Sequence, residues 1–189
     1  MIEPLINTDI ELLIYLNNLG TEQWDRFWLI LSNKFSAIPL YALLLYLSVK
    51  EIGLKRSLWL LFFIAILIAV SDQTSNLFKY GFKRLRPCHD ESIMNSIRLV
   101  KDSCGGLYSY FSAHAANTMA IALFFGHLLK NRIKYIFTGL VLWALLVAYS
   151  RVYIGVHFPL DIVTGMLFGV LYGTLFYRLY QLFIKRFVN

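Results

Sequence analysis

Long apolar segments separated by short polar connections make up most of the chain. They cover about 26–49, 57–79, 113–129, 134–150 and 158–179. A helix needs roughly 20 mostly apolar residues to cross about 30 Å of hydrocarbon, so each segment is close to the length of a membrane span. The pattern predicts an all-α integral membrane protein, built as a bundle of about five transmembrane helices.

A shorter amphipathic segment precedes the first span. Thr8 to Glu11 has the pattern of a capping box, and the apolar stripe that follows predicts a helix over 8–20 that lies in the membrane interface. Trp24 and Trp28 come next, where an aromatic belt is expected. The N-terminal end of the protein is therefore predicted to sit at the membrane surface.

Composition supports a bilayer environment and one domain over residues 1–189. The chain is 58% hydrophobic and 15% charged, and its net charge is +7. The basic residues gather at span ends and around one loop, which favours membrane topology and a phosphate site over nucleic-acid binding. Acidic Glu3, Asp9 and Glu11 stand where a cleavable signal would carry basic residues, so we expect none.

The short connections predict the orientation in the membrane. Five spans place the loops 50–56 and 130–134 and the C-terminal tail on one face, and these segments are rich in Lys and Arg. Such loops favour the cytoplasmic side. We therefore expect an inner-membrane protein whose N-terminus and long polar loop face the periplasm or exterior, with 88–111 forming a lid over the site.

Three polar stretches lie at the outer ends of predicted spans and are expected at one depth. They are Lys79–Pro87, Phe111–His114 and Ser150–Asp161. Lys79, Arg86 and Arg151 supply cations for phosphate oxygens, and the two arginines can bind bidentately. Ser112 stands before a helical run, so its hydroxyl and the first free backbone N–H groups form an anion cradle.

The remaining polar side chains supply a nucleophile and an acid. Pro159 suits the first turn of the last span, which places His157 just outside that helix and Asp161 one turn inside. Asp161 can then accept one imidazole N–H of His157 and leave the other nitrogen free to attack phosphorus. His114 can protonate the leaving oxygen.

Each stretch also has a purely structural interpretation. The basic stretch can contact lipid headgroups, Ser112 can be an ordinary helix cap, and His157 with Asp161 can be a structural pair. Finding all three in order at one membrane face favours the catalytic interpretation.

The three stretches resemble the signature of the type 2 phosphatidic acid phosphatase superfamily, which also includes vanadium-dependent haloperoxidases. That signature is Lys, six residues, Arg-Pro; then Pro-Ser-Gly-His; then Ser-Arg, five residues, His, three residues, Asp. The first and third parts match at every defined position, whereas the second has Phe111 for proline and Ala113 for glycine.

The resemblance implies a role for each matching residue. His157 would form a phosphohistidine, Asp161 would orient it, and His114 would protonate the leaving group. The phosphate-binding residues would be Lys79, Arg86, Ser112, Ala113 and Arg151. The resemblance implies no metal or other cofactor. The two cysteines and the histidines outside the three motifs form no credible zinc site.

Two further features support the site. Asp72 shares a helical face with Lys79, so we expect it to play a supporting role with that cation as its partner. Cys88 and Cys104 lie in the long loop, where an oxidising compartment favours a disulfide, with two free thiols as the alternative.

The predicted reaction is hydrolysis of a phosphate monoester or pyrophosphate on a membrane lipid. Undecaprenyl pyrophosphate, phosphatidylglycerophosphate, phosphatidic acid and lipid A all fit the motifs. The alternatives are phosphotransfer to a lipid or sugar hydroxyl, a vanadate-dependent haloperoxidase, and a non-catalytic lipid-binding or transport protein.

Overall fold

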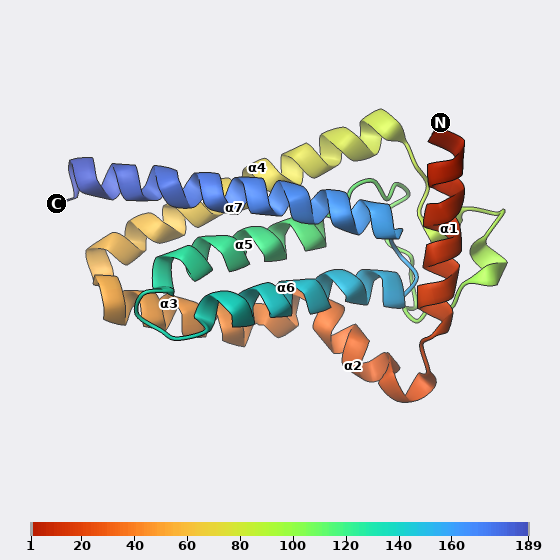
Figure 1. Ribbon diagram of the computed structural model, residues 1–189, viewed down its shortest axis with the longest axis horizontal. Helices are drawn as coiled ribbons and strands as arrows, with labels where there is room; N and C mark the ends of the chain where they lie inside the picture. The colour runs from red at the N-terminus through yellow and green to blue at the C-terminus, as the bar shows by residue number, and fades with distance from the viewer. Residues whose placement is uncertain (1, 189) are drawn as a thin grey trace.

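Helices dominate the computed structural model, which describes residues 2–188. They are α1 (Ile2–Asn18), α2 (Glu22–Ser32), η1 (Lys34–Ala37), α3 (Ile38–Ile52), α4 (Leu54–Phe82), η2 (Pro87–His89), η3 (Met94–Ser96), α5 (Ala113–Leu129), α6 (Ile136–Tyr153) and α7 (Pro159–Phe187). Figure 1 shows α3 to α7 running along the long axis of a bundle, with α1 lying across one end. The predicted all-α membrane bundle is confirmed.

Within residues 2–188, four helical segments are long and apolar enough to cross a membrane. They are Lys34–Ile52, α4, α6 and α7. Helix α5 has 17 residues, or about 26 Å, and most of its side chains are buried against its neighbours. The shorter helix therefore lies at the centre of the bundle, and longer helices surround it.

The segment predicted as one span at 26–49 is divided in the structure. Helix α2 ends at Ser32, and the Asn33 side chain accepts a hydrogen bond from the Phe35 N–H at 3.0 Å. Pro39 then occupies the first turn of α3, where a missing N–H costs nothing. Because Asn33 ends one helix and Pro39 begins another, α2 leans away from the bundle and α3 lies along it (Figure 1).

Helix α1 begins at Ile2, before the start predicted at residue 8. The Thr8 hydroxyl donates to the carbonyl of Pro4 at 2.9 Å, one turn back in the same helix. Thr8 is therefore inside the helix, and the capping-box interpretation is wrong. Asp9 is 5% exposed and faces the protein.

Glycines on α7 allow it to pack closely on α5. They are Gly165, Gly169 and Gly173, spaced one turn apart. A Cβ built on Gly169 would lie 2.6 Å from the Ala116 carbonyl oxygen, and one on Gly165 would lie 2.6 Å from the Ser112 carbonyl oxygen. Small residues at this spacing let two membrane helices approach backbone to backbone. This contact brings the first turns of α5 and α7 together.

A buried asparagine fixes α1 to the bundle. The Asn17 amide donates to the carbonyls of Arg98, Val152 and Tyr153 at 3.1, 3.2 and 2.7 Å, and its oxygen accepts the Arg98 N–H at 2.6 Å. One side chain thus ties α1, the long loop and the end of α6 together.

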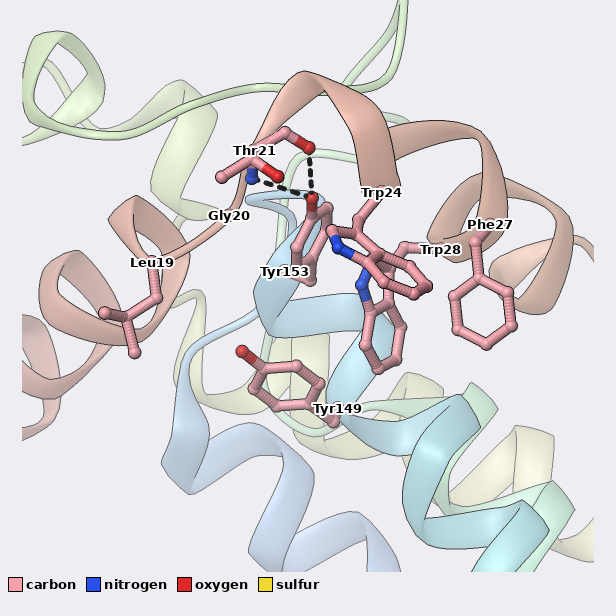
Figure 2. Close-up of a pocket in the computed structure, with 8 residues that line it drawn as sticks. All are labelled: Leu19, Gly20, Thr21, Trp24, Phe27, Trp28, Tyr149 and Tyr153. Carbon is pink, nitrogen blue, oxygen red and sulfur yellow. Dashed lines mark hydrogen bonds between the residues drawn. The ribbon is translucent and has the colours of Figure 1, made fainter.

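The turn between α1 and α2 rests on an aromatic cluster. Figure 2 shows Tyr153 under this turn, where its hydroxyl donates to the Thr21 carbonyl at 2.8 Å and accepts the Thr21 N–H at 3.1 Å. Trp28 stacks on Tyr153 at 5.2 Å, and Trp24 and Phe27 line the same pocket of about 300 Å³. Exposed Trp24 and Phe27 are typical of an aromatic belt, which places this end of the bundle at a membrane interface.

Candidate active site

The three predicted stretches converge at the end of the bundle that α1 crosses (Figure 1). Lys79 lies in the last turns of α4, His114 in the first turn of α5, and Arg151 near the end of α6. Arg86 follows α4, and His157 precedes α7. The antiparallel course of these helices therefore places residues from three distant parts of the chain at one depth.

A buried histidine and aspartate form the core of the site. His157 Nδ1 lies 3.2 Å from Asp161 Oδ2, and the two side chains are 2% and 0% exposed. The Phe158 N–H donates to the same carboxylate oxygen at 3.0 Å. Asp161 is thereby fixed as the acceptor for Nδ1–H, which leaves the lone pair of His157 on Nε2.

Electrostatics keep His157 neutral. Burial lowers the pKa of its imidazole well below the usual range, and the positive charges of Arg86, Arg151 and Lys79 lower that pKa further. A neutral imidazole with a free Nε2 is the form that can attack phosphorus.

The first turn of α5 supplies backbone N–H groups near this pair. Ser112 caps the helix, with its hydroxyl accepting the Ala115 N–H at 3.4 Å, and its own N–H donates to the Asp161 carbonyl at 3.1 Å. Ala113 is the first helical residue, so it needs no positive φ and fits where the family pattern has glycine. The first N–H groups of this helix have no acceptor within it and are suited to bind an anion.

Phe111 takes the place of the family's proline. It is fully buried and stacks on Phe168 of α7 at 4.8 Å, and its carbonyl accepts the Ser75 hydroxyl of α4 at 3.0 Å. Packing and this hydrogen bond therefore fix the approach to Ser112 from two neighbouring helices.

The two arginines are fixed in different ways. Arg86 donates through a terminal nitrogen to the Cys104 carbonyl at 2.7 Å and through Nε to the Tyr108 carbonyl at 3.4 Å. Arg151 is 6% exposed and donates to the Ser32 hydroxyl of α2. Its buried Nε has no hydrogen-bond partner among residues 2–188. A buried cationic donor without an acceptor is well suited to bind a phosphate oxygen.

A cavity of about 790 Å³ opens beside this cluster. Lys79, Arg86, Ala113 and His114 line its polar end. Apolar side chains form the remainder, among them Ile38, Leu45, Leu61, Ile64, Ile68, Ile121, Phe125 and Val147. This combination of cationic and apolar lining suits an amphiphile with a charged head and apolar chains.

Some predicted site residues do not line this cavity. Ser112, Arg151, His157 and Asp161 are buried next to its polar end, and Arg151 is linked to it through Ser32, which does line it. Lys79, Arg86 and His114 therefore face the cavity, whereas the His157 side chain is buried beside it.

Asp72 lies in the cavity wall but has a different partner from the one expected. Its Oδ1 accepts the Asn117 amide at 2.8 Å, and no ion pair within 4.0 Å joins it to Lys79 in the described part of the chain. Helix packing decides this pairing, because α4 and α5 place these two side chains face to face.

Two charged residues near His157 and Asp161 were not singled out by the motifs. Arg84 lies 3.6 Å from Asp161, and Asp9 of α1 lies 2.7 Å from Arg84. Arg84 stands inside the first stretch without being a defined position, and Asp9 had been assigned to the capping box. In the sequence, only their charges could have pointed to a role for Arg84 and Asp9.

The long loop is closed by a disulfide between Cys88 and Cys104, with a Cα–Cα distance of 6.0 Å. Because the Cys104 carbonyl accepts from Arg86, the disulfide helps to fix Arg86, one of the predicted phosphate ligands.

We expect reduction with dithiothreitol to lower phosphate affinity before it unfolds the protein. The KM should rise several-fold, and the free energy of unfolding should fall by about 3 kcal/mol. Kinetics and thermal unfolding with and without reductant measure both effects. The Cys88→Ser/Cys104→Ser variant should have the same KM as the reduced protein, and dithiothreitol should not change it further. An unchanged KM in both the reduced protein and the variant would show that the disulfide does not position Arg86.

Comparisons with known proteins place the chain among phosphatases. Residues 56–185 match the PAP2 superfamily. The chain is 36% identical over 169 residues to the lipid A 4'-phosphatase of Bacteroides thetaiotaomicron, covering 88% of this chain and 74% of that protein. It is 29% identical over 181 residues to the lipid A 4'-phosphatase of Porphyromonas gingivalis, covering 94% and 75%. The crystal structure of Aquifex aeolicus LpxE is similar with a TM-score of 0.68 and 25% identity, over 89% of this chain and 93% of that one.

Proposed function

The chain belongs to the PAP2 superfamily, and on that premise we propose that it removes the 4′-phosphate of lipid A through a phosphohistidine on His157. The cavity supports this proposal most directly, because its cationic end and its apolar walls suit a phosphorylated lipid. The cationic end lies at the face that also holds α1 and the long loop, which we propose is the periplasmic face of the inner membrane.

The first displacement transfers the phosphoryl group to the protein. Lys79, Arg86 and Arg151 neutralise the non-bridging oxygens, and Nε2 of His157 attacks phosphorus. The bond to the lipid oxygen breaks as the new N–P bond forms, and protonated His114 gives its proton to that oxygen. Asp161 holds Nδ1–H and balances the positive charge that develops on the imidazole ring.

The second displacement releases phosphate. His114, now neutral, takes a proton from water, and the oxygen of that water attacks the phosphohistidine. The N–P bond breaks, inorganic phosphate leaves, and His157 and His114 return to their starting states. The three cations act in both steps because each displacement passes through the same charge distribution.

Lipid A is the proposed substrate because two relatives that align with most of the chain are named as lipid A 4'-phosphatases. Specificity for the headgroup would then reside in the polar part of the cavity, where Asp72 and Asn117 join Lys79, Arg86 and His114.

A phosphate-release assay on purified protein in detergent tests the substrate. We expect release from lipid A at a kcat/KM at least tenfold above that for undecaprenyl pyrophosphate, phosphatidylglycerophosphate or phosphatidic acid. Vanadate should inhibit, and EDTA should leave the rate unchanged because side-chain cations neutralise the phosphate. Preference for another lipid would contradict the proposed substrate; transfer of phosphate to a second lipid without release would indicate phosphotransfer.

A further inference from the structure

A chain of ion pairs links α1 to the catalytic pair. We propose that Arg84 and Asp9 are positioning residues, which hold Asp161 so that it orients His157 for attack. This role rests on the proposed function, because it assigns a purpose to the orientation of His157. Neither residue is a defined position of the three motifs.

Arg84 contacts the side of Asp161 that faces away from His157. One terminal nitrogen of its guanidinium lies 3.6 Å from Asp161 Oδ1, and the other lies 2.7 Å from Asp9 Oδ2. The guanidinium carbon lies 3.6 Å from the centre of the Phe158 ring. Arg84 is thus held by an ion pair and a stacking contact while it faces Asp161.

Asp161 needs this cation because its two oxygens have unequal surroundings. Oδ2 accepts from Phe158 N–H and pairs with His157, whereas Oδ1 has no hydrogen-bond partner among residues 2–188. A fully buried carboxylate is costly unless a nearby charge compensates it. Loss of Arg84 would remove a compensating charge and so favour rotation or protonation of Asp161, and either change would weaken its hold on His157.

Asp9 fixes both Arg84 and the start of α7. Its Oδ2 pairs with Arg84, and its Oδ1 accepts the Leu160 N–H of the first turn of α7 at 2.8 Å. A carboxylate is also favourable at the positive end of a helix dipole. Because Asp9 lies on α1, the seating of this interfacial helix is coupled to the geometry of the catalytic pair.

Arg84 is placed to act through Asp161 and not on the substrate. It does not line the cavity, whereas Lys79 and Arg86 do. Its removal should therefore change the rate of the chemical step more than the affinity for lipid.

Steady-state kinetics test the proposal. The substrate is whichever of the four lipids in the phosphate-release assay the wild-type protein hydrolyses fastest. For Arg84→Gln we expect kcat to fall about 10- to 100-fold with KM within about twofold. Arg84→Lys should recover part of the lost kcat, because it restores the charge. Asp9→Asn should lower kcat less, and the double variant should fall no further than Arg84→Gln, since both residues act through one contact.

A second ion pair in the chain provides a matched control. Arg98 of the long loop lies 2.9 Å from Asp25 of α2, so it also joins the loop to an N-terminal helix, and neither residue contacts His157 or Asp161. Arg98→Gln and Asp25→Asn should leave kcat within about twofold of wild type. Thermal unfolding of all variants separates loss of structure from loss of positioning.

Four outcomes would overturn the proposal. Wild-type protein that releases phosphate from none of the lipids contradicts the proposed function and, with it, this role. An active wild type with an unchanged kcat in Arg84→Gln contradicts the positioning role alone. A raised KM at constant kcat would assign Arg84 to substrate binding, and an equal loss of kcat in Arg98→Gln would assign both ion pairs to structure.

Discussion

Replacing His157 with glutamine is expected to reduce phosphate release by a factor of about 10⁴ or more. Glutamine can still donate to Asp161 through its amide, but it has no nucleophilic nitrogen, so the phosphoenzyme cannot form. Phosphate release from lipid measures the rate, and trapping with ³²P-labelled substrate measures the intermediate. Wild-type protein should yield an acid-labile, base-stable phosphoenzyme that is missing from the variant.

The control for this prediction is His114→Gln, which keeps the nucleophile and removes the acid. It should lower the rate by about 10²- to 10⁴-fold, and any label that it traps should still be on His157. Label that persists in His157→Gln, or phosphate release close to the wild-type rate, would show that His157 is not the nucleophile.

Replacing Arg151 with lysine is expected to lower kcat by about 10²- to 10³-fold. Arg151 is buried and presents an Nε without a partner among the described residues, and its planar group can bind two phosphate oxygens at once. Lysine keeps the charge but cannot make the same paired contacts. The loss should therefore appear in kcat/KM and in weaker inhibition by vanadate, which occupies the same site.

Ser32→Ala serves as the control, because it removes the hydrogen bond from α2 to Arg151 but keeps the guanidinium group itself. We expect this variant to lose less than about tenfold. If Ser32→Ala and Arg151→Lys were equally impaired, orientation by α2 would account for the effect, and direct binding of phosphate by Arg151 would be contradicted.

Short-range spacing allowed most of the candidate site to be predicted. Helix α7 begins at Pro159, two residues after His157, so Asp161 falls in its first turn and faces the imidazole. Ser112 likewise had to cap the helix that follows it. Both arrangements depend on local backbone geometry, which the order of residues controls directly.

Other contacts had no local signal. Asp9 and Arg84 are far apart in the sequence, and α1 had to cross the end of the bundle before one could reach the other. The partner of Asp72 also depended on which helix packed against α4, and the answer was Asn117 of α5.

The sequence by itself determined the membrane bundle, its three motifs and their common depth, because hydrophobic length and residue spacing are properties of each helical segment alone. Only the tertiary structure decided where α2 ends against α3, how closely α7 approaches α5 at its glycines, and which charges support Asp161. These features arise from contacts between helices, and their energies depend on burial and distance in three dimensions.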